Sequence, residues 1–122
     1  MANEFDYFAK AKYNLKSSII LYENGQYNSS ISLSYYAMFE ATNALLKKKG
    51  LFSKTHEGTQ VLFYKEYVKK GLFDANTASL LSKCQSDRKK ADYDIEIDFP
   101  EQKARWNIDI AKDFLKEVEK LL

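Results

Sequence analysis

Residues 27–46 form the segment that most constrains how this chain can fold. Its apolar side chains recur at steps of four and three, which is the spacing of one face of an α-helix. Small residues such as Ser34, Ala37 and Ala41 lie among them and would let neighbouring helices approach closely. The pattern predicts a core helix whose inward face consists of Tyr27, Ile31, Tyr35, Met38, Thr42 and Leu45.

The rest of the chain also favours helices, because only four glycines and one proline interrupt its 122 residues. A first helix is predicted from Asn3, its expected cap, to about Asn24, and Gly25 ends it. The core helix then runs to about Lys49 and ends at Gly50. We expect the first helix to bury Phe8, Ala11, Leu15, Ile19 and Tyr22.

Three further helices are predicted in the second half of the chain. Thr55 is the expected cap of a short third helix that Gly71 closes, and a fourth begins near Asn76 or Thr77. Residues 92–99 alternate between acidic and apolar side chains and predict an extended connector or a very short strand. Asp98, as the cap, and Pro100 then start the last helix. The expected buried residues are Val61, Tyr64 and Val68 in the third helix, Leu81, Cys84 and Ala91 in the fourth, and Ala104, Ile108, Ala111, Leu115, Val118 and Leu122 in the last.

The predicted fold class is therefore all-α: an antiparallel, up-and-down bundle of four main helices plus one short helix. Connections between the helices are short, so helices that are neighbours in sequence are expected to be neighbours in space. The length fits one core, and no repeat or linker divides the chain, so residues 1–122 are interpreted as a single domain.

Composition excludes several classes of function. The net charge of +2 selects no anionic partner by itself, and neither Cys84 nor His56, each the only residue of its type, has metal-ligand spacing around it. We therefore expect no metal and no cofactor. No basic, apolar leader and no run near the ~18 apolar residues of a membrane span is present, so a cytoplasmic protein without membrane contact is predicted.

The nine tyrosines admit two interpretations. Tyrosine can fill the core of a protein, since its ring can be buried while its hydroxyl stays solvated, or it can lie at an interface with another chain. Tyr35 and Tyr36 point to different sides of one helix, so at least one of the two phenols must meet another element or a second chain. We expect a homodimer with this pair at the interface.

Arg88 is the most unusual residue by position. It lies on the same stripe as Leu81 and Cys84, and a guanidinium on an apolar stripe is costly unless a carboxylate or a phosphate answers it. One interpretation is an internal ion pair with Asp92, Asp87 or a carboxylate of the last helix. The other is an anion site, in which Arg88 offers two parallel hydrogen bonds to a phosphate.

His56 is the second candidate. It follows Thr55 at the start of the predicted third helix, where a histidine is often only a structural, hydrogen-bonded group. Free amides and the positive end of the dipole also make a helix N-terminus a natural phosphate site. If His56 and Arg88 converge, they could form an anion pocket or an acid–base pair, and the sequence leaves this open.

Three motifs carry a resemblance to a known family. The run Ser-x-Ser-Tyr-Tyr-Ala-Met-Phe-x-Ala-x-x-Ala-Leu-Leu ending at Leu46, the Lys-x-His-x-Gly turn of Lys54 to Gly58, and the Arg-x-x-Ala-Asp-Tyr end of Arg88 to Tyr93 resemble small prokaryotic HEPN-domain proteins (higher eukaryotes and prokaryotes nucleotide-binding). The resemblance implies a homodimeric helical bundle. It also implies a nucleotidyltransferase partner in a toxin–antitoxin pair, with Tyr93 as the residue that such a partner could modify.

Catalytic HEPN ribonucleases carry an arginine and a histidine with four to six residues between them, and they cleave RNA without metal. Here Arg88 is present, but Tyr93, Asp94 and Ile95 occupy the positions open to that histidine. No group there titrates near neutral pH, so the usual acid–base chemistry is not expected.

The sequence thus favours a HEPN-domain protein that binds nucleotide or RNA and acts with a nucleotidyltransferase in a toxin–antitoxin or defence-type module. The alternatives are a metal-independent endoribonuclease, in which Arg88 acts with His56 or Tyr93, and a purely structural interaction module. The residues expected to contact nucleotide or RNA are Lys54, His56, Arg88, Lys89, Asp92 and Tyr93.

Overall fold

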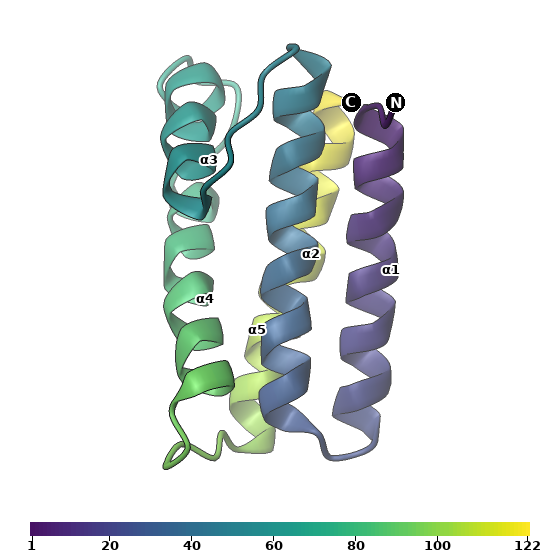
Figure 1. Ribbon diagram of the computed structural model, residues 1–122, viewed down its shortest axis with the longest axis vertical. Coiled ribbons are helices and arrows are strands. Elements are labelled where there is room, and N and C mark those ends of the chain that lie inside the picture. Colours follow the sequence, from purple (N-terminus) through teal and green to yellow (C-terminus); the bar gives the residue numbers. More distant parts are fainter.

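The computed structural model describes all residues 1–122, and its regular elements are all helices, without a strand (Figure 1). The predicted all-α bundle is confirmed. Its elements are α1 (Glu4–Glu23), α2 (Tyr27–Lys48), α3 (His56–Phe63), the π-helix η1 (Tyr64–Val68), α4 (Ala75–Tyr93) and α5 (Glu101–Leu121).

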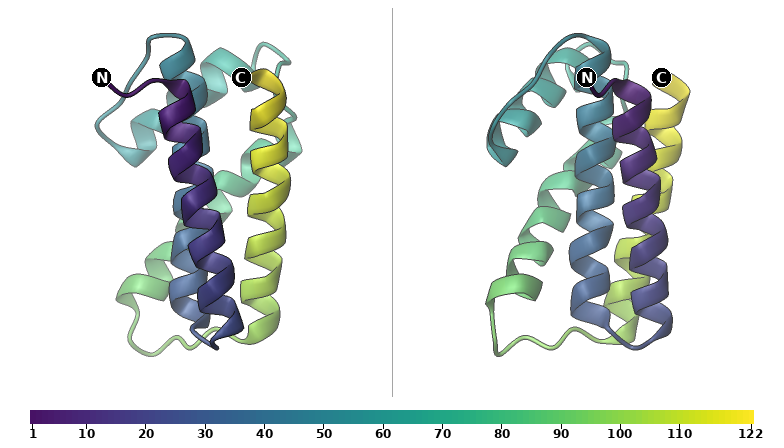
Figure 2. Two further views of the ribbon diagram at one scale, coloured as in Figure 1. Left: turned by 90° about the vertical axis from the view of Figure 1, so that its right-hand side faces the viewer. Right: turned by 45° about the vertical axis from the view of Figure 1, so that its right-hand side comes forward.

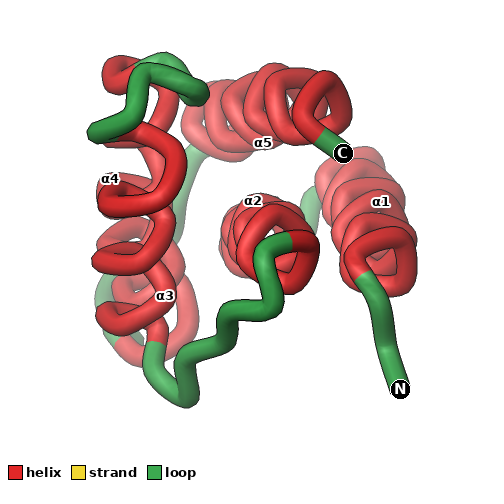
Figure 3. The backbone as a smooth tube through the Cα atoms, turned by 90° about the horizontal axis from the view of Figure 1, so that it is seen from above, coloured by secondary structure: helices red, strands yellow, loops and turns green.

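Helix α2 is the centre of the bundle. Seen from above, α1, α5 and the α3–α4 layer surround it on three sides (Figure 3). Of the predicted inward residues, Ile31, Tyr35, Met38, Thr42 and Leu45 are fully buried and Tyr27 is half-buried, and the alanines between them are buried as well. This burial on several faces explains why the helix carries so many small residues.

The contact between α1 and α2 uses two buried serines. Ser18 Oγ donates to the Ser30 carbonyl at 2.7 Å, and Ser30 Oγ donates to the Ser18 carbonyl at 2.8 Å. Small hydroxyl side chains allow the two backbones to approach each other. The predicted cap Asn3 is confirmed, since its Oδ1 accepts from the amides of Phe5 and Asp6.

The predicted stripe of α1 is only partly right. Phe8 and Ala11 are buried, but Asn14 and Ser18 complete the buried face, and Leu15, Ile19 and Tyr22 are half-buried beside it. The close serine contact places the narrowest side of the helix against α2, and this turns the larger apolar side chains to the edges of the contact.

The prediction for the third helix was wrong about its inward face. Val61 is 66% exposed and Tyr64 is 59% exposed, while Thr59, Phe63 and Tyr67 point inward. The helix widens into η1, where the Lys69 amide donates to the carbonyl of Tyr64, five residues earlier, at 2.8 Å. The wider turn brings Tyr67 onto the buried side, and its hydroxyl donates to the Leu45 carbonyl at 2.6 Å.

Helix α5 buries the predicted stripe from Ala104 to Val118, with Phe114 added and Leu122 half-buried. A polar cluster around the buried Asp87 joins it to α4. Asp87 forms an ion pair with Lys103 at 2.8 Å and accepts a hydrogen bond from Asn107 Nδ2 at 3.2 Å. Trp106, the single tryptophan, lies beneath Lys103 at 4.1 Å and Lys83 at 5.8 Å from the ring centroid.

The connector between α4 and α5 passes the end of the bundle opposite the termini and contains no strand (Figure 2). Asn28 of α2 fixes it, because its side chain donates to the Ile97 carbonyl and accepts from the Phe99 amide, both at 2.9 Å. The last helix starts after Pro100 with no side-chain cap, so the predicted cap Asp98 was wrong. No helix combines the length and the apolar character needed to cross a membrane.

Candidate functional site

The candidate site is assembled where the first turn of α3 meets the middle of α2. His56 stacks on Phe39 with 4.2 Å between ring centroids, and it also lies against Tyr35 and Tyr36 at 5.8 and 6.3 Å. Its Nδ1 is 2.6 Å from the hydroxyl of Tyr35. Three rings of one helix therefore fix the position of the only histidine.

The turn before α3 explains why the Lys-x-His-x-Gly sequence ends in a glycine. The predicted cap Thr55 is confirmed, because its Oγ1 accepts from the Gly58 amide at 2.9 Å. A Cβ atom at position 58 would collide with Ser53 Oγ and would also lie 2.8 Å from Thr55 Oγ1. Glycine at position 58 lets the loop close over the helix start, and this closure holds His56 on the side facing α2.

Arg88 enters the same region from α4. It is only 6% exposed, and its guanidinium carbon lies 5.6 Å from the Tyr35 ring centroid and 5.4 Å from the Tyr36 ring centroid. Arg88 and His56 therefore converge on the same two tyrosine rings. We refer to Tyr35, Tyr36, His56 and Arg88 as the arginine–histidine cluster.

The Arg88 guanidinium has few hydrogen-bond and ion-pair partners within the protein. Its one ion pair is to Asp92, with 3.5 Å between Nη1 and Oδ2, which is longer than a charge-assisted hydrogen bond. Asp92 is partly exposed and also accepts from Ser32 Oγ. Asp87, another partner that the sequence allowed, faces α5 instead, and Arg88 Nε is buried without any partner.

The cluster changes the protonation of its members. Burial raises the pKa of Tyr35 well above its ordinary value, so the phenol stays neutral. Burial and the nearby Arg88 charge lower the pKa of His56, with a smaller effect of Lys89 in the same direction and an opposing one of Glu57. At neutral pH the cluster therefore presents one fixed positive charge and a neutral imidazole.

The other residues singled out in the sequence lie around the cluster or beside it. Tyr93 is 77% exposed, with its ring centroid 5.9 Å from the Arg88 guanidinium carbon. Lys89 reaches Glu57 at 4.0 Å and links α4 to the start of α3. Lys54 is exposed in the loop before α3 and makes no ion pair.

The two tyrosines expected at a dimer interface have different surroundings. Tyr35 is fully buried within the chain and has no surface to offer a second copy, whereas Tyr36 is half-buried. The dimer therefore stays a prediction, and of this pair only Tyr36 can contribute to it.

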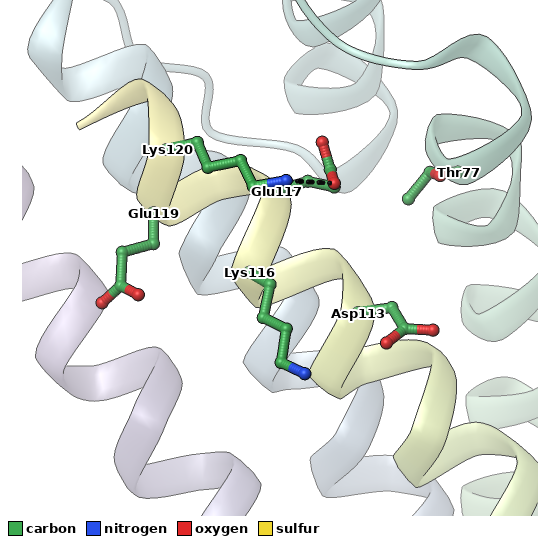
Figure 4. Close-up of a pocket in the computed structure, with 6 residues that line it drawn as sticks. All are labelled: Thr77, Asp113, Lys116, Glu117, Glu119 and Lys120. Atoms are coloured by element: carbon green, nitrogen blue, oxygen red, sulfur yellow. Dashed lines mark hydrogen bonds and ion pairs between the residues drawn. The ribbon is translucent and has the colours of Figure 1, made fainter.

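None of the hollows on the surface is lined by a residue of the cluster, although one beside it is lined by Lys89 and Tyr93. Another, lined by Thr77, Asp113, Lys116, Glu117, Glu119 and Lys120, mixes both signs of charge, and its Glu117 and Lys120 pair with each other at 3.2 Å (Figure 4). No group of three or more histidine, cysteine or carboxylate side chains gathers anywhere in a way that could hold a metal ion.

Sequence reasoning missed Tyr35 and Phe39 as members of the site. Both belong to the motif that carried the resemblance, but the helical pattern marked Tyr35 as core and gave Phe39 no role. Two facts in the sequence could have indicated them together: a tyrosine predicted in the core needs a hydrogen-bond partner for its hydroxyl, and the chain has a single histidine that could serve.

By its fold and its site, the protein is of the class of all-helical bundles with a charged, aromatic cluster, which here lies between α2, α3 and α4. The HEPN domain family matches residues 6–121, so the chain belongs to the HEPN family. It is 31% identical over 113 residues to the protein named "Putative toxin MJ0142" of Methanocaldococcus jannaschii, which covers 93% of this chain and 77% of that protein. It is also 31% identical over 113 residues to a UPF0332 protein of Thermotoga maritima, with 93% and 86% covered. A second protein of Methanocaldococcus jannaschii, "Putative toxin MJ0605", is 32% identical over 114 residues, with 88% and 85% covered.

Proposed function

We propose that this HEPN protein binds a phosphate group of a nucleotide or an RNA at the arginine–histidine cluster. We further propose that it acts with a nucleotidyltransferase partner in a toxin–antitoxin or defence-type module. The observation that carries the first part is Arg88: it is buried, its only ion pair is long, and its Nε has no partner. A buried guanidinium with unused donors is suited to a phosphate, which can accept two parallel hydrogen bonds.

Neighbouring groups support the same ligand. Thr55 caps the first turn of α3 beside His56, so the positive end of that helix dipole adds to the Arg88 charge. Tyr93 is largely exposed next to Arg88 and offers a ring on which a base could stack. Lys54 and Lys89 add further positive charge near the start of α3.

The test is a titration with adenosine diphosphate and with single-stranded RNA, followed by calorimetry or fluorescence. Arg88→Ala is expected to weaken binding by about 1.5–3 kcal/mol, since charged hydrogen bonds are lost. The matched control is Arg105→Ala, which removes the only other arginine, an exposed one, and the same charge. Equal losses in the two variants at one salt concentration would reduce the site to nonspecific charge and contradict the proposal.

The toxin-like part is supported by two relatives from Methanocaldococcus jannaschii, both of which are named putative toxins. The chain has no histidine after Arg88, so slow or no cleavage of single-stranded RNA is expected, with or without a chelator. Robust cleavage that survives the chelator and is lost in both Arg88→Ala and His56→Ala would instead favour the endoribonuclease alternative.

Tyr93 is the proposed target of the partner. In such a modification the phenol oxygen of Tyr93 bonds to the α-phosphate of a nucleoside triphosphate, pyrophosphate leaves, and the phenol proton goes to solvent. Co-expression with a nucleotidyltransferase encoded beside this protein should then add the mass of one nucleotide to the wild type and none to Tyr93→Phe. Tyr13→Phe, which changes another exposed tyrosine, should still be modified.

We also propose a homodimer in which Tyr36 lies at or near the interface. Sedimentation at micromolar concentration should give about twice the chain mass. A strict monomer at that concentration would contradict the dimer and any site composed from two chains.

A further inference from the structure

The hydroxyl of Tyr35 has one hydrogen-bond partner in the protein, Nδ1 of His56 at 2.6 Å. Tyr35 is fully buried, so no water can replace that partner. The other phenols with hydrogen bonds donate to obligate acceptors: Tyr67 to the Leu45 carbonyl and Tyr22 to the Glu101 carboxylate. The partner of Tyr35 alone is a ring nitrogen whose role depends on where the imidazole carries its proton.

Burial decides that role. If Nδ1 carried the proton and donated to the phenol oxygen, the phenol proton would be left in the core with no acceptor, which is costly. If the phenol donates instead, Nδ1 is the acceptor and the imidazole proton must be on Nε2. The second arrangement leaves no buried donor without a partner, so it is favoured.

A protonated imidazole is disfavoured for the same reason, since it would also carry a proton on Nδ1. The charged groups around His56 act mostly in the same direction. Arg88 and Lys89 of α4 oppose a positive charge on the ring and only Glu57 favours it, while burial raises the pKa of Tyr35 of α2 and keeps its phenol neutral. His56 is therefore held neutral with its proton on Nε2.

Nε2 is the nitrogen that a ligand can reach. It makes no hydrogen bond within the protein and is not fully buried, so on the half-buried His56 side chain it keeps contact with solvent. We propose that Tyr35 is a positioning residue that fixes His56 as a hydrogen-bond donor through Nε2, so that His56 contributes a donor, not a base, to the phosphate that Arg88 holds. The ligand in this statement rests on the function proposed above, whereas the proton position does not.

The chain offers a direct test because His56 is its only histidine. Long-range proton–nitrogen NMR spectra of 15N-labelled protein then contain one imidazole, and they show which nitrogen is protonated. At pH 7.5 the wild type should show a protonated Nε2 and an unprotonated Nδ1. A wild-type spectrum with the proton on Nδ1 would overturn the inference without any variant.

Tyr35→Phe keeps the ring that packs in the core and removes only the donor. It should give a mixture of the two neutral tautomers, and the pKa of His56 should rise toward its ordinary value. The matched control is Tyr36→Phe, because Tyr36 also lies against the imidazole but makes no hydrogen bond to it. An unchanged tautomer in Tyr35→Phe, or an equal change in Tyr36→Phe, would remove the positioning role.

Binding gives a second readout. Titrated with adenosine diphosphate at pH 7.5, Tyr35→Phe should bind about 2- to 10-fold more weakly than the wild type, the range expected for one misplaced neutral hydrogen bond. Equal affinity would show that the proton position does not serve the ligand, and would overturn that part of the inference. A wild type that binds no phosphate ligand but has the expected tautomer would end the proposed function, while the proton assignment would stand.

Discussion

Helices α4 and α5 lie against the same central helix and have similar lengths, 19 and 21 residues, but they bury opposite kinds of side chain. The buried face of α5 is apolar apart from Asn107, and that of α4 contains two apolar residues followed by three polar ones. The buried residues are Ala104, Asn107, Ile108, Ala111, Phe114, Leu115 and Val118 in α5, and Leu81, Cys84, Gln85, Asp87 and Arg88 in α4.

This difference in buried side chains assigns the two helices different roles, stability to α5 and ligand recognition to α4. Apolar area removed from water stabilises a fold by roughly 25 cal/mol per Å², whereas a buried charge stabilises little even when it is paired. The contacts of α5 therefore hold the bundle together. The C-terminal half of α4 contributes less to the free energy of unfolding and instead holds Arg88 beside His56. Substitutions in the apolar face of α5 should therefore lower stability, and substitution of Arg88 in α4 should mainly weaken binding.

The largest effect is expected in α5. Phe114 is fully buried, and its ring centroid lies 5.1 Å from that of Phe73 and 5.9 Å from that of Phe63. Phe114→Ala should lower the free energy of unfolding by about 3–5 kcal/mol, because it leaves a cavity in the core. Denaturant melts measure the loss, and a cost below that of the α4 variants would break the comparison.

The next effect is expected where the two helices meet. Asp87→Ala removes the buried acceptor of Lys103 and Asn107, and it should cost about 1–3 kcal/mol because donors lose their partner. Asp113→Ala, an exposed aspartate of α5 without an ion pair, should change stability by less than about 0.5 kcal/mol. Nucleotide binding should be the same in both variants.

A smaller change in stability is expected for Arg88→Ala, less than about 1 kcal/mol, because its one ion partner, Asp92, is partly exposed and can be solvated. The same variant should lose phosphate binding, as stated above. A loss of 3–5 kcal/mol with unchanged binding would mean that Arg88 is a structural ion pair after all.

The smallest effect concerns pH. The pKa of His56 is lower in the folded protein than in the unfolded chain, so the unfolded chain binds more protons as the pH falls. Stability should therefore be full above the unfolded value, about 6.5, and decline as the pH falls from there toward the lower pKa of the folded state. Melts between pH 5.5 and pH 8 should show a weaker decline in His56→Gln, and an equal decline in both proteins would contradict the assignment.

The same contrast explains how far the sequence could predict the molecule. The buried face of α5 from Ala104 to Val118 was predicted except for Asn107 and Phe114, because helical spacing within one segment sets its positions. The inward face of α3 was not predicted correctly, because the π-helix η1 changes the helical spacing. Whether η1 forms depends on how the chain packs on α2.

The candidate site was predicted in part for a similar reason. Arg88 stood out because a charge on an apolar stripe is visible in the sequence, and His56 was marked by the cap beside it. The bond between Tyr35 and His56 joins two helices at a separation of 21 residues, so only the docking of α3 on α2 reveals it.

Trp106 gives the molecule an optical reporter of its own. As the only indole in the chain, it lies at the contact of α4 with α5, beneath the ammonium groups of Lys103 and Lys83. If α4 separates from α5 while the helices persist, water replaces these contacts and the emission shifts to longer wavelength, but the circular dichroism of the backbone hardly changes. Comparing the two signals during unfolding would then show whether α4 separates from α5 before the helices of the bundle unfold.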